Sequence, residues 1–394
     1  MPTSHARTRR PIVLLLLAIG CGGSPDAPAE GTVTDSAGVA LVSAPATDRA
    51  LPWALEEIDL IGGADSGAEA FTRASRDLVM TDGRDRIAVY DRDASQVRVF
   101  DGAGAALHAL GGPGGGPGEI GFGFGLFDVG PGRVAVFDFA KNALLTWSLE
   151  GELLSEGPLG IPGGGWDRGR LIGDTLLVSR TDIDSTRTLT ELVRMAPADT
   201  QVIMAVESPP RQMAQMGCFA AQIPPMFAPG VAWAAHDDRV AVLRQDRYVV
   251  DLYRAGRLER SIRRDIVGRE TTPTDADSLY PEGMKVSFGG QGGGCTVEAS
   301  KVAEAVGMAD RLPVLRDVAF GPEGSIWVQR YGFPGSEPVT DVFDATGRYL
   351  GTDHGHGLPL GALSNGRVLF AAADTSTGVT RIGIHALPEL ADRP

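Results

Sequence analysis

The sequence predicts an all-β fold, a six-bladed β-propeller built from four-stranded antiparallel blades. One stretch, residues 85–111, shows the unit: Val89, Val97 and Val99 alternate with polar or small residues, as in strands with one buried face. Glycine-containing turns such as 101–104 separate these stretches, because glycine adopts the positive φ that tight hairpins need. The unit then recurs along the chain, and this recurrence predicts the architecture.

The second strand of each unit is the easiest to align. It recurs with spacings of 47, 42, 64, 86 and 42 residues, at 87–89, 134–136, 176–178, 240–242, 326–328 and 368–370. The shorter spacings match the ~40–50 residues of a four-stranded propeller blade. The sixth unit ends after its third strand, near 382–386, and we expect the N-terminal strand 56–61 to complete it. Such pairing of the two chain ends closes the ring and removes exposed sheet edges.

The N-terminus predicts export. Residues 1–20 contain a basic segment with Arg9 and Arg10, then an apolar run that is too short to span a bilayer as a helix. Residues 17–21 resemble a bacterial lipobox, although Ala18 stands where leucine is usual, and the resemblance implies lipidation of Cys21. An ordinary signal peptide with an unmodified cysteine, or export by the twin-arginine route, are the alternatives. We expect a protein anchored to a cell-envelope membrane, facing the periplasm or the exterior.

The segment after the cysteine predicts a flexible tether over 21–35, since Val33 is its only large apolar residue. The propeller is expected over 36–394. Removal of residues 1–20, which contain three arginines and no acid, changes the formal net charge from −14 to −17. Such an acidic chain is a poor candidate for nucleic acid or for anionic lipid surfaces. Membrane contact is therefore expected through the lipid only, and we expect a monomer.

Two long insertions, 207–229 and 264–313, precede blades four and five. Each holds one cysteine, Cys218 and Cys295, and in an exported protein two such cysteines in neighbouring loops predict a disulfide. Free thiols or a metal site are the alternatives. The apolar spacing over 296–312 predicts a short helix with Thr296 as a possible N-cap.

A family resemblance follows from these strands. The sequence from Val89 to Asp91, then 97–101 with Gly104, resembles the NHL-type repeat of six-bladed β-propellers. The segments 136–138 and 342–347 show the same pattern, and 111–119 is similar to a segment of bacterial propeller lipoproteins. The resemblance implies the fold alone, because propellers with this repeat serve as binding platforms, scaffolds, hydrolases and lyases.

No motif predicts a cofactor or a metal. The pairs Asp91/Asp93 and Asp182/Asp184 resemble the start of calcium loops, but they lack the following glycine and distal glutamate, so a repeated turn is the preferred interpretation. Methionines around Cys218 are soft ligands that would suit Cu(I), but packing in a loop explains them better. The glycines of 116–121 precede a strand instead of the helix that nucleotide binding needs.

The inner strands supply charged residues for the central channel. Arg76, Arg170 and Arg316 lie in or near predicted first strands, where they would hold a small anionic ligand. The simpler interpretation is that they pair with acids in a hydrated channel.

Strand direction predicts the functional face. The connections between first and second strands, and between third and fourth strands, are tight turns. All long connections lie at the opposite ends of the strands. Binding sites concentrate on long loops carried by a rigid scaffold, so we expect a binding module for a protein, peptide or glycan. A metal-assisted hydrolase or lyase at the channel mouth, or a structural envelope component, are the alternatives.

Overall fold

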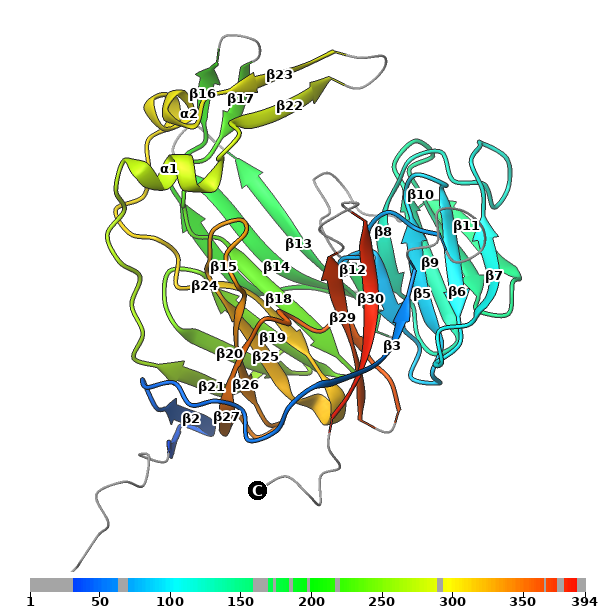
Figure 1. The fold of residues 1–394 in the computed structure, drawn as a ribbon, viewed down its shortest axis with the longest axis horizontal. Coiled ribbons are helices and arrows are strands. Elements are labelled where there is room, and N and C mark those ends of the chain that lie inside the picture. The colour runs from blue at the N-terminus through cyan, green and yellow to red at the C-terminus, as the bar shows by residue number, and fades with distance from the viewer. Residues whose placement is uncertain are drawn as a thin grey trace, which may run out of the picture. The chain divides into compact units, whose positions relative to one another are not determined.

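The structure is a computed structural model, and it describes residues 31–62, 70–158, 169–172, 175–183, 187–196, 199–216, 220–288, 293–364, 366–373 and 379–387. Residues from Gly31 onward form one compact unit. Within it nearly all regular elements are β-strands, which pair mainly in antiparallel sheets (Figure 1). The predicted signal peptide and Cys21 lie outside the described residues.

Six groups of strands repeat the same order of four strands, and we call each a blade; a single parallel bridge between β8 and β12 joins blades two and three into one eight-stranded sheet. Blades one to three contain, in order, β4 (Val79–Thr81), β5 (Ile87–Asp91), β6 (Gln96–Phe100), β7 (Ala106–Gly111); β8 (Gly123–Asp128), β9 (Arg133–Asp138), β10 (Ala143–Ser148), β11 (Leu153–Pro158); β12 (Gly169–Ile172), β13 (Thr175–Ile183), β14 (Thr188–Ala196), β15 (Asp199–Ser208). Each of the predicted second strands in this half lies within β5, β9 or β13.

The second half repeats the pattern. Blades four to six contain β18 (Val231–His236), β19 (Arg239–Arg244), β20 (Val249–Arg254), β21 (Arg257–Arg264); β24 (Leu315–Phe320), β25 (Ile326–Arg330), β26 (Val339–Phe343), β27 (Tyr349–His354); β28 (Gly361–Ala362), β29 (Arg367–Ala373), β30 (Thr380–Ala386) and β3 (Glu56–Ile61). A 3₁₀ turn, η1 (Pro322–Gly324), joins β24 to β25. The remaining predicted second strands lie in β19, β25 and β29.

The sixth blade takes its outer strand from the N-terminal side of the chain. β3 pairs with β30 in antiparallel register, with Glu56 opposite Ala386 and Ile61 opposite Ile382. Ile61 and Ile382 are both almost fully buried. The strand that the sequence predicts over 56–61 therefore completes the last blade through backbone pairing with β30, and Ile61 packs in the seam with blade one.

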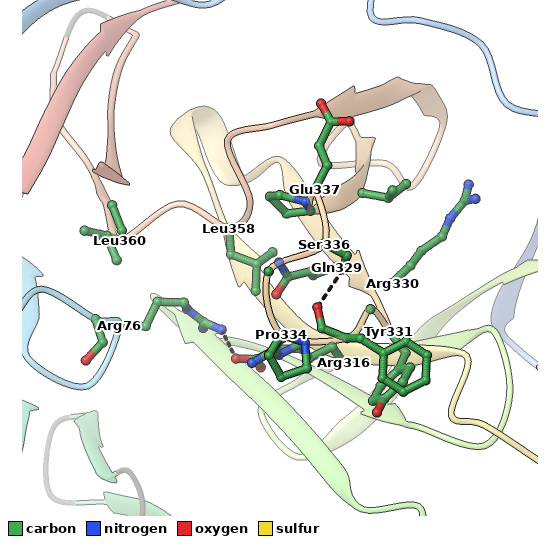
Figure 2. Close-up of a pocket in the computed structure, with 18 of the residues that line it drawn as sticks. Arg76, Arg316, Gln329, Arg330, Tyr331, Pro334, Ser336, Glu337, Leu358 and Leu360 are labelled. Carbon is green, nitrogen blue, oxygen red and sulfur yellow. Dashed lines mark hydrogen bonds and ion pairs between the residues drawn. The ribbon is translucent and has the colours of Figure 1, made fainter. Parts of the chain in front are cut away.

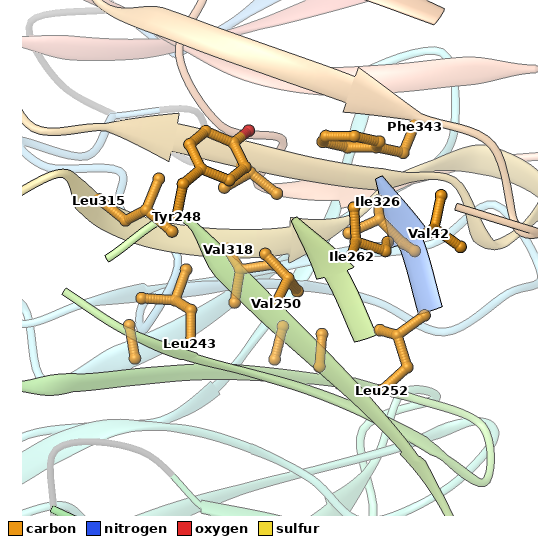
Figure 3. Close-up of a cluster of buried hydrophobic side chains, with 14 of the residues drawn as sticks. Val42, Leu243, Tyr248, Val250, Leu252, Ile262, Leu315, Val318, Ile326 and Phe343 are labelled. Atoms are coloured by element: carbon orange, nitrogen blue, oxygen red, sulfur yellow. The ribbon is translucent and has the colours of Figure 1, made fainter. Parts of the chain in front are cut away.

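Buried apolar side chains join every blade to the next. Separate clusters lie between blades one and two, two and three, three and four, four and five, five and six, and six and one, so the contacts form a closed cycle. At the seam of blades four and five, Val250 and Ile262 pack against Val318 and Ile326 (Figure 3). These seams arise directly from the alternating pattern, since each strand presents its apolar positions to a neighbouring blade.

An additional hairpin extends blade four. β1 (Thr32–Ser36) pairs with β2 (Val39–Ala44), and β2 lies parallel to β21, so this blade is six-stranded. Val42 of β2 is buried in the seam with blade five (Figure 3). The predicted tether over 21–35 thus overlaps a strand at its end. Its alternation of threonine and valine is compatible with an exposed edge strand that pairs through backbone groups alone.

The two insertions fold together into what we call the cap, residues 207–229 and 264–313. It contains β16 (Gln212–Gln215), β17 (Ala220–Ile223), α1 (Thr274–Leu279), β22 (Met284–Phe288), β23 (Gly293–Val297) and α2 (Ala299–Val306), which lie together in Figure 1. Backbone hydrogen bonds join its two halves, from Met226 N to Gly307 O at 2.9 Å and from Ala309 N to Met226 O at 2.8 Å.

The predicted helix in the cap exists but is shorter than expected. α2 begins at Ala299 with Glu298 in the N-cap position, whereas Thr296, the expected cap, lies in β23. Residues 293–297 pair with β22, so the first residues of the predicted helical stretch form a strand of this hairpin. Val302 and Val306 are buried, in agreement with the helical spacing. No helix in the described part of the chain is long and apolar enough to cross a membrane.

Candidate functional site

The long connections all lie at one end of the strands, and we call this end the loop-rich face. It carries the starts of the first strands, the ends of the second strands and both halves of the cap. At the opposite end, the tight-turn face, three carboxylates close their own turns. Asp82, Asp101 and Asp344 each accept two backbone N–H groups from residues two and four positions later, at 2.8–3.1 Å.

A cavity of about 590 Å³ opens at the loop-rich face (Figure 2). Residues 329–339, from the end of β25 to the start of β26, form one wall. Residues 74–77 before β4, Arg316 and Asp317 of β24, and the segment 358–360 before β28 supply the rest. Because β4, β24 and β28 are innermost strands of their blades, this cavity is the mouth of the central channel.

An ion pair crosses this channel between blades one and five. Arg76 Nη1 lies 2.7 Å from Asp317 Oδ2, and less than a fifth of each side chain is exposed. The neighbouring Arg316 is exposed and has no ion-pair or hydrogen-bond partner for its guanidinium among the described residues. Its backbone is fixed, since Gln245 Nε2 donates to the carbonyl of Arg316 at 2.8 Å. Arg76 is therefore satisfied at the mouth, whereas Arg316 is available.

The third predicted channel arginine belongs to a different cavity. Arg170 Nη2 lies 3.1 Å from Asp128 Oδ2, and its other nitrogen donates to the carbonyl of Ala235. Both Arg170 and Arg76 line a cavity of about 470 Å³ toward the tight-turn face. His236 also lines it, and burial lowers the pKa of this histidine below 6.5. The three arginines thus do not converge on one cavity, and only Arg76 and Arg316 share the mouth.

A buried charge network supports the wall of the mouth. Asp341, fully buried, accepts hydrogen bonds from Arg330 Nη2 at 2.8 Å and from Thr352 Oγ1 at 2.7 Å, and it lies 2.8 Å from Arg264 Nη1. Arg264 and Arg330 also bind Asp48, in the segment before β3. Both arginines lower the pKa of Asp48, while burial and the nearby Asp341 raise the pKa of Tyr248 well above 10.0.

This network is structural because its charges satisfy one another. The side chain of Arg264 has no exposed surface, and it also donates to the carbonyls of Pro45 at 2.7 Å and Thr47 at 3.2 Å. Its guanidinium stacks on the ring of Tyr349 at 4.3 Å. The N-terminal segment is thereby fixed to blades four and five, and Arg330, which lines the mouth, is held in place.

The cap supports the same wall from the other side. Phe227 of the first insertion contacts Tyr331 and Phe333 edge-on, with ring centroids 6.3 and 6.2 Å apart. Arg269 lies over the ring of Phe333 at 5.9 Å and binds Asp275 at 2.6 Å, which holds the pKa of that carboxyl well below its usual range. Burial raises the pKa of Tyr331, so its hydroxyl stays protonated as a donor at neutral pH.

A cluster of exposed phenylalanines lies elsewhere on the loop-rich face, and we call it the Phe patch: Phe122, Phe124 and Phe139. Their exposed fractions are 57%, 40% and 62%, and their ring centroids are 5.7–6.3 Å apart. They are the phenylalanines that the structure shows as exposed in the part of the chain it describes. The other exposed large apolar side chains in that part are aliphatic, such as Leu107 and Leu154.

The Phe patch is held in place by one buried carboxylate. Asp138 accepts the backbone N–H groups of Gly121 at 2.6 Å, Phe122 at 3.2 Å and Ala140 at 2.9 Å. Phe139 N also donates to the carbonyl of Phe122 at 2.8 Å. Because Asp138 joins both segments that carry the patch, the three rings are positioned before any partner arrives.

Sequence reasoning missed the Phe patch. Phe122 and Phe124, two residues apart at the start of β8, are exposed, whereas Phe127, at an odd-numbered position of the same alternation, is buried. That alternation was a usable signal, since two aromatic side chains on the solvent side of a strand are unusual. The alternation gave no sign of Phe139, which joins the other two phenylalanines from the connection after β9.

The predicted turn carboxylates and cysteines have different outcomes. Asp91 accepts the N–H of Ala94 at 3.3 Å and pairs with Arg98 at 3.0 Å, as expected of a turn. The prediction that this turn repeats at Asp182 was wrong, because Asp182 lies within the strand β13, opposite Leu189 of β14. Asp184 and Cys218 lie outside the described residues. Cys295 lies in β23 and packs on the apolar cluster of the cap. Searched over the described residues, the structure contains no group of three His, Cys, Asp or Glu side chains arranged to hold a metal ion.

Comparison with known proteins agrees with this architecture. A family model described as a 6-bladed β-propeller matches residues 75–161, which span blades one and two. The fold is a six-bladed β-propeller. The NHL-like pattern in blades one and two is consistent with it, because Asp91 and Asp138 both end a second strand and close the turn that follows.

Solved structures resemble this propeller at low sequence identity. A protein from Bacteroides fragilis described as exported is 9% identical, with a TM-score of 0.48, and the match covers 89% of this chain and 100% of that one. A DUF4221 family member from Bacteroides vulgatus is 7% identical (TM-score 0.43; 91% and 99% covered). The Swd1 β-propeller domain from Myceliophthora thermophila is 11% identical (TM-score 0.40; 85% and 100% covered). No curated protein matches the chain in sequence.

Proposed function

We propose that this β-propeller is an exported binding module that attaches to a bacterial cell-envelope membrane through lipid on Cys21 and binds a protein or peptide partner with the Phe patch. The observation that carries the proposal is the grouping of three exposed phenylalanines on the loop-rich face. Contiguous exposed apolar surface on a rigid scaffold commonly marks a contact site. Of the three function classes considered from the sequence, a binding module is the one this observation favours.

The chemistry of the patch favours a peptide or protein over a glycan. Phenylalanine rings offer apolar area without a hydroxyl or ring N–H to donate, and aromatic residues are enriched at protein interfaces. Asp138 fixes the backbone that carries the rings, so little conformational entropy is lost on binding. We therefore expect a partner that inserts large apolar side chains among the three rings.

A displayed peptide library selected on the purified domain tests this proposal. We expect enriched peptides with large apolar side chains, and at least 100-fold weaker binding to the variant Phe122→Ser/Phe124→Ser/Phe139→Ser, since central aromatic contacts dominate interface energy. The matched control changes three exposed leucines on the outer strands of blades one and two, Leu107, Leu153 and Leu154, to serine.

Three outcomes would count against the proposal. Enriched peptides that bind the phenylalanine and leucine variants equally would place the contact elsewhere. Binding of the wild-type domain to phosphatidylcholine vesicles, lost in the phenylalanine variant, would show that the rings insert into a membrane. Selective binding on a glycan array with no peptide enrichment would instead identify a carbohydrate partner.

The anchor is tested separately. In the full-length chain, Cys21→Ser should move the protein from the membrane fraction to the soluble fraction, because a lipidated cysteine is the proposed attachment. The mature N-terminal peptide should carry acyl groups in mass spectrometry. Unchanged membrane association of Cys21→Ser would contradict the lipid anchor.

We also propose that Cys218 and Cys295 form a disulfide within the cap. The position of Cys295 supports this, because it packs on the cluster that contains Ala214 and Met216, shortly before Cys218 in the chain. Such a bond would join the two insertions, which already share Met226 and Met308 as bridge partners. Mass spectrometry of unreduced peptides should find the two cysteines linked, and two free thiols would contradict the proposal.

A further inference from the structure

The channel mouth combines polar and apolar side chains. Arg316, Tyr331 and Gln329 offer polar groups, and Leu358 and Leu360 line the same cavity, with Leu358 beside Gln329 (Figure 2). Its volume of about 590 Å³ lies within the range of small-molecule sites, ~300–1,000 Å³. Such sites typically combine apolar walls with a few polar groups that fix orientation.

The charges at the mouth leave Arg316 available. Asp317 is its neighbour in sequence, but that carboxylate is bound to Arg76 at 2.7 Å. Arg330 lines the same cavity and is satisfied by Asp48 and Asp341. In the described part of the molecule, Arg316 is therefore the arginine of this cavity whose guanidinium has no acidic partner.

Two neutral residues of the cavity lining also carry donors without a hydrogen bond among the residues that the structure describes. The Tyr331 hydroxyl and the Gln329 side-chain amide both lack a partner in the described part of the chain. Tyr331 is held by Phe227 and Phe333 of the apolar cluster, with ring centroids 6.3 and 5.7 Å away. Gln329 lies near the end of β25. These donors are thus positioned by packing that does not use their polar atoms.

We propose that the channel mouth binds a small organic anion, with its carboxylate or phosphate on Arg316 and its apolar body against Leu358 and Leu360. A guanidinium pairs strongly with either anion through two parallel N–H groups. Tyr331 and Gln329 would then donate to the remaining oxygens or to polar atoms of the ligand. This site is separate from the Phe patch, so a test of anion binding does not depend on whether the Phe patch binds a partner.

A paired fragment library tests the site on the purified exported domain. Each aromatic or aliphatic carboxylic acid, and each phosphate monoester, is matched with its neutral amide or alcohol, and inorganic phosphate is included alone. Saturation-transfer NMR should find binders among the acids and not among their neutral partners. The two acid classes, scored separately, show whether carboxylate or phosphate is preferred.

Variants then assign the binding to Arg316. Arg316→Gln should weaken the best acids at least tenfold in calorimetric titration, and Arg316→Lys should retain part of the affinity, because it keeps the charge and loses the bidentate geometry. Arg247→Gln is the matched control, since Arg247 is an exposed arginine on the loop after β19 that does not line the cavity. The proposal is overturned if no acid binds, if neutral partners bind as well, or if Arg247→Gln weakens binding as much as Arg316→Gln.

Discussion

The two faces of the propeller share the same kinds of polar contact but differ in what they expose. On the tight-turn face, Asp101 and Asp344 bind backbone groups within four residues of themselves. Contacts between distant segments occur on both faces, since Arg367 binds Asp85 on the tight-turn face and Arg330 binds Asp48 on the loop-rich face, each pair 282 residues apart. The loop-rich face alone combines these contacts with long connections. This face also exposes the Phe patch and leaves Arg316 available.

One scaffold thus separates stability from recognition. Three turns of the tight-turn face are closed by a carboxylate of the turn itself, a pattern that needs only a short sequence signal. The loop-rich face can vary in length and chemistry because the seams between blades, not the loops, hold the strands together. A substitution on the loop-rich face is therefore expected to act in one of two ways. It either breaks a contact between distant segments and lowers stability, or it changes an exposed group and alters binding alone.

The largest expected effect comes from the buried network. Asp341→Ala should lower the free energy of unfolding by about 3–5 kcal/mol, because it leaves Arg264 buried without one of its carboxylate partners. Urea denaturation measures this loss of unfolding free energy.

The paired variant Arg264→Met/Asp341→Leu is the control for this network. This variant should lose less unfolding free energy than Asp341→Ala, since no isolated charge remains buried. A loss below about 1 kcal/mol for Asp341→Ala would mean that water or a rearranged Asp48 compensates the charge.

A smaller effect is expected on the tight-turn face. Asp101→Ala and Asp344→Ala should each cost about 1 kcal/mol of unfolding free energy, since each carboxylate satisfies two backbone donors of its turn. The control Glu207→Ala removes an exposed pair with Arg187 and should change stability by less than about 0.5 kcal/mol. Equal losses in all three variants would erase the difference drawn between turn carboxylates and ordinary surface acids.

The closing seam gives a pH effect that is smaller still. Burial and the adjacent His356, whose ring centroid lies 5.0 Å away, lower the pKa of His385 below 6.5, and Glu57 and Asp353 oppose this shift. As the pH falls below 6.5, the unfolded chain gains a proton that the folded chain resists, so stability present above pH 6.5 is progressively lost.

His385→Gln should make this loss shallower, by at most about tenfold in the unfolding constant per pH unit. Denaturation at several pH values between 5 and 8 measures it, and His236, whose pKa is also lowered, accounts for part of the slope that remains. A variant with an unchanged slope would show that His385 is not one of the groups responsible.

Much of the fold was predictable because its signals are local. Alternation and turn glycines located the second strands, and the missing fourth strand in the last unit pointed to 56–61, which pairs with β30. The helix start at Thr296 was wrong because pairing of β23 with β22 overrides a short helical pattern. The network of Arg264, Asp341 and Asp48 could not be predicted, since no spacing brings together residues from three separate segments.

The candidate site was predictable in part. The arginines Arg76, Arg170 and Arg316 were identified near the channel, but their division between two cavities depends on strand twist and side-chain direction. The Phe patch joins two connections that only the turn at Asp138 brings together. The alternating direction of the strands was enough to predict which face carries the long loops. The side chains that meet on that face could not be predicted in this way.

The central claim is that the Phe patch is the contact surface, and site-specific photo-crosslinking in the cells that make this protein tests it most directly. A benzophenone amino acid replaces Phe139 in the full-length chain, and in a control chain it replaces Leu154. The account predicts a discrete crosslinked partner from position 139 only, and its loss when Phe122→Ser and Phe124→Ser are added. Crosslinks of equal yield from position 154, or a crosslink at 139 that survives loss of both neighbouring rings, would contradict it.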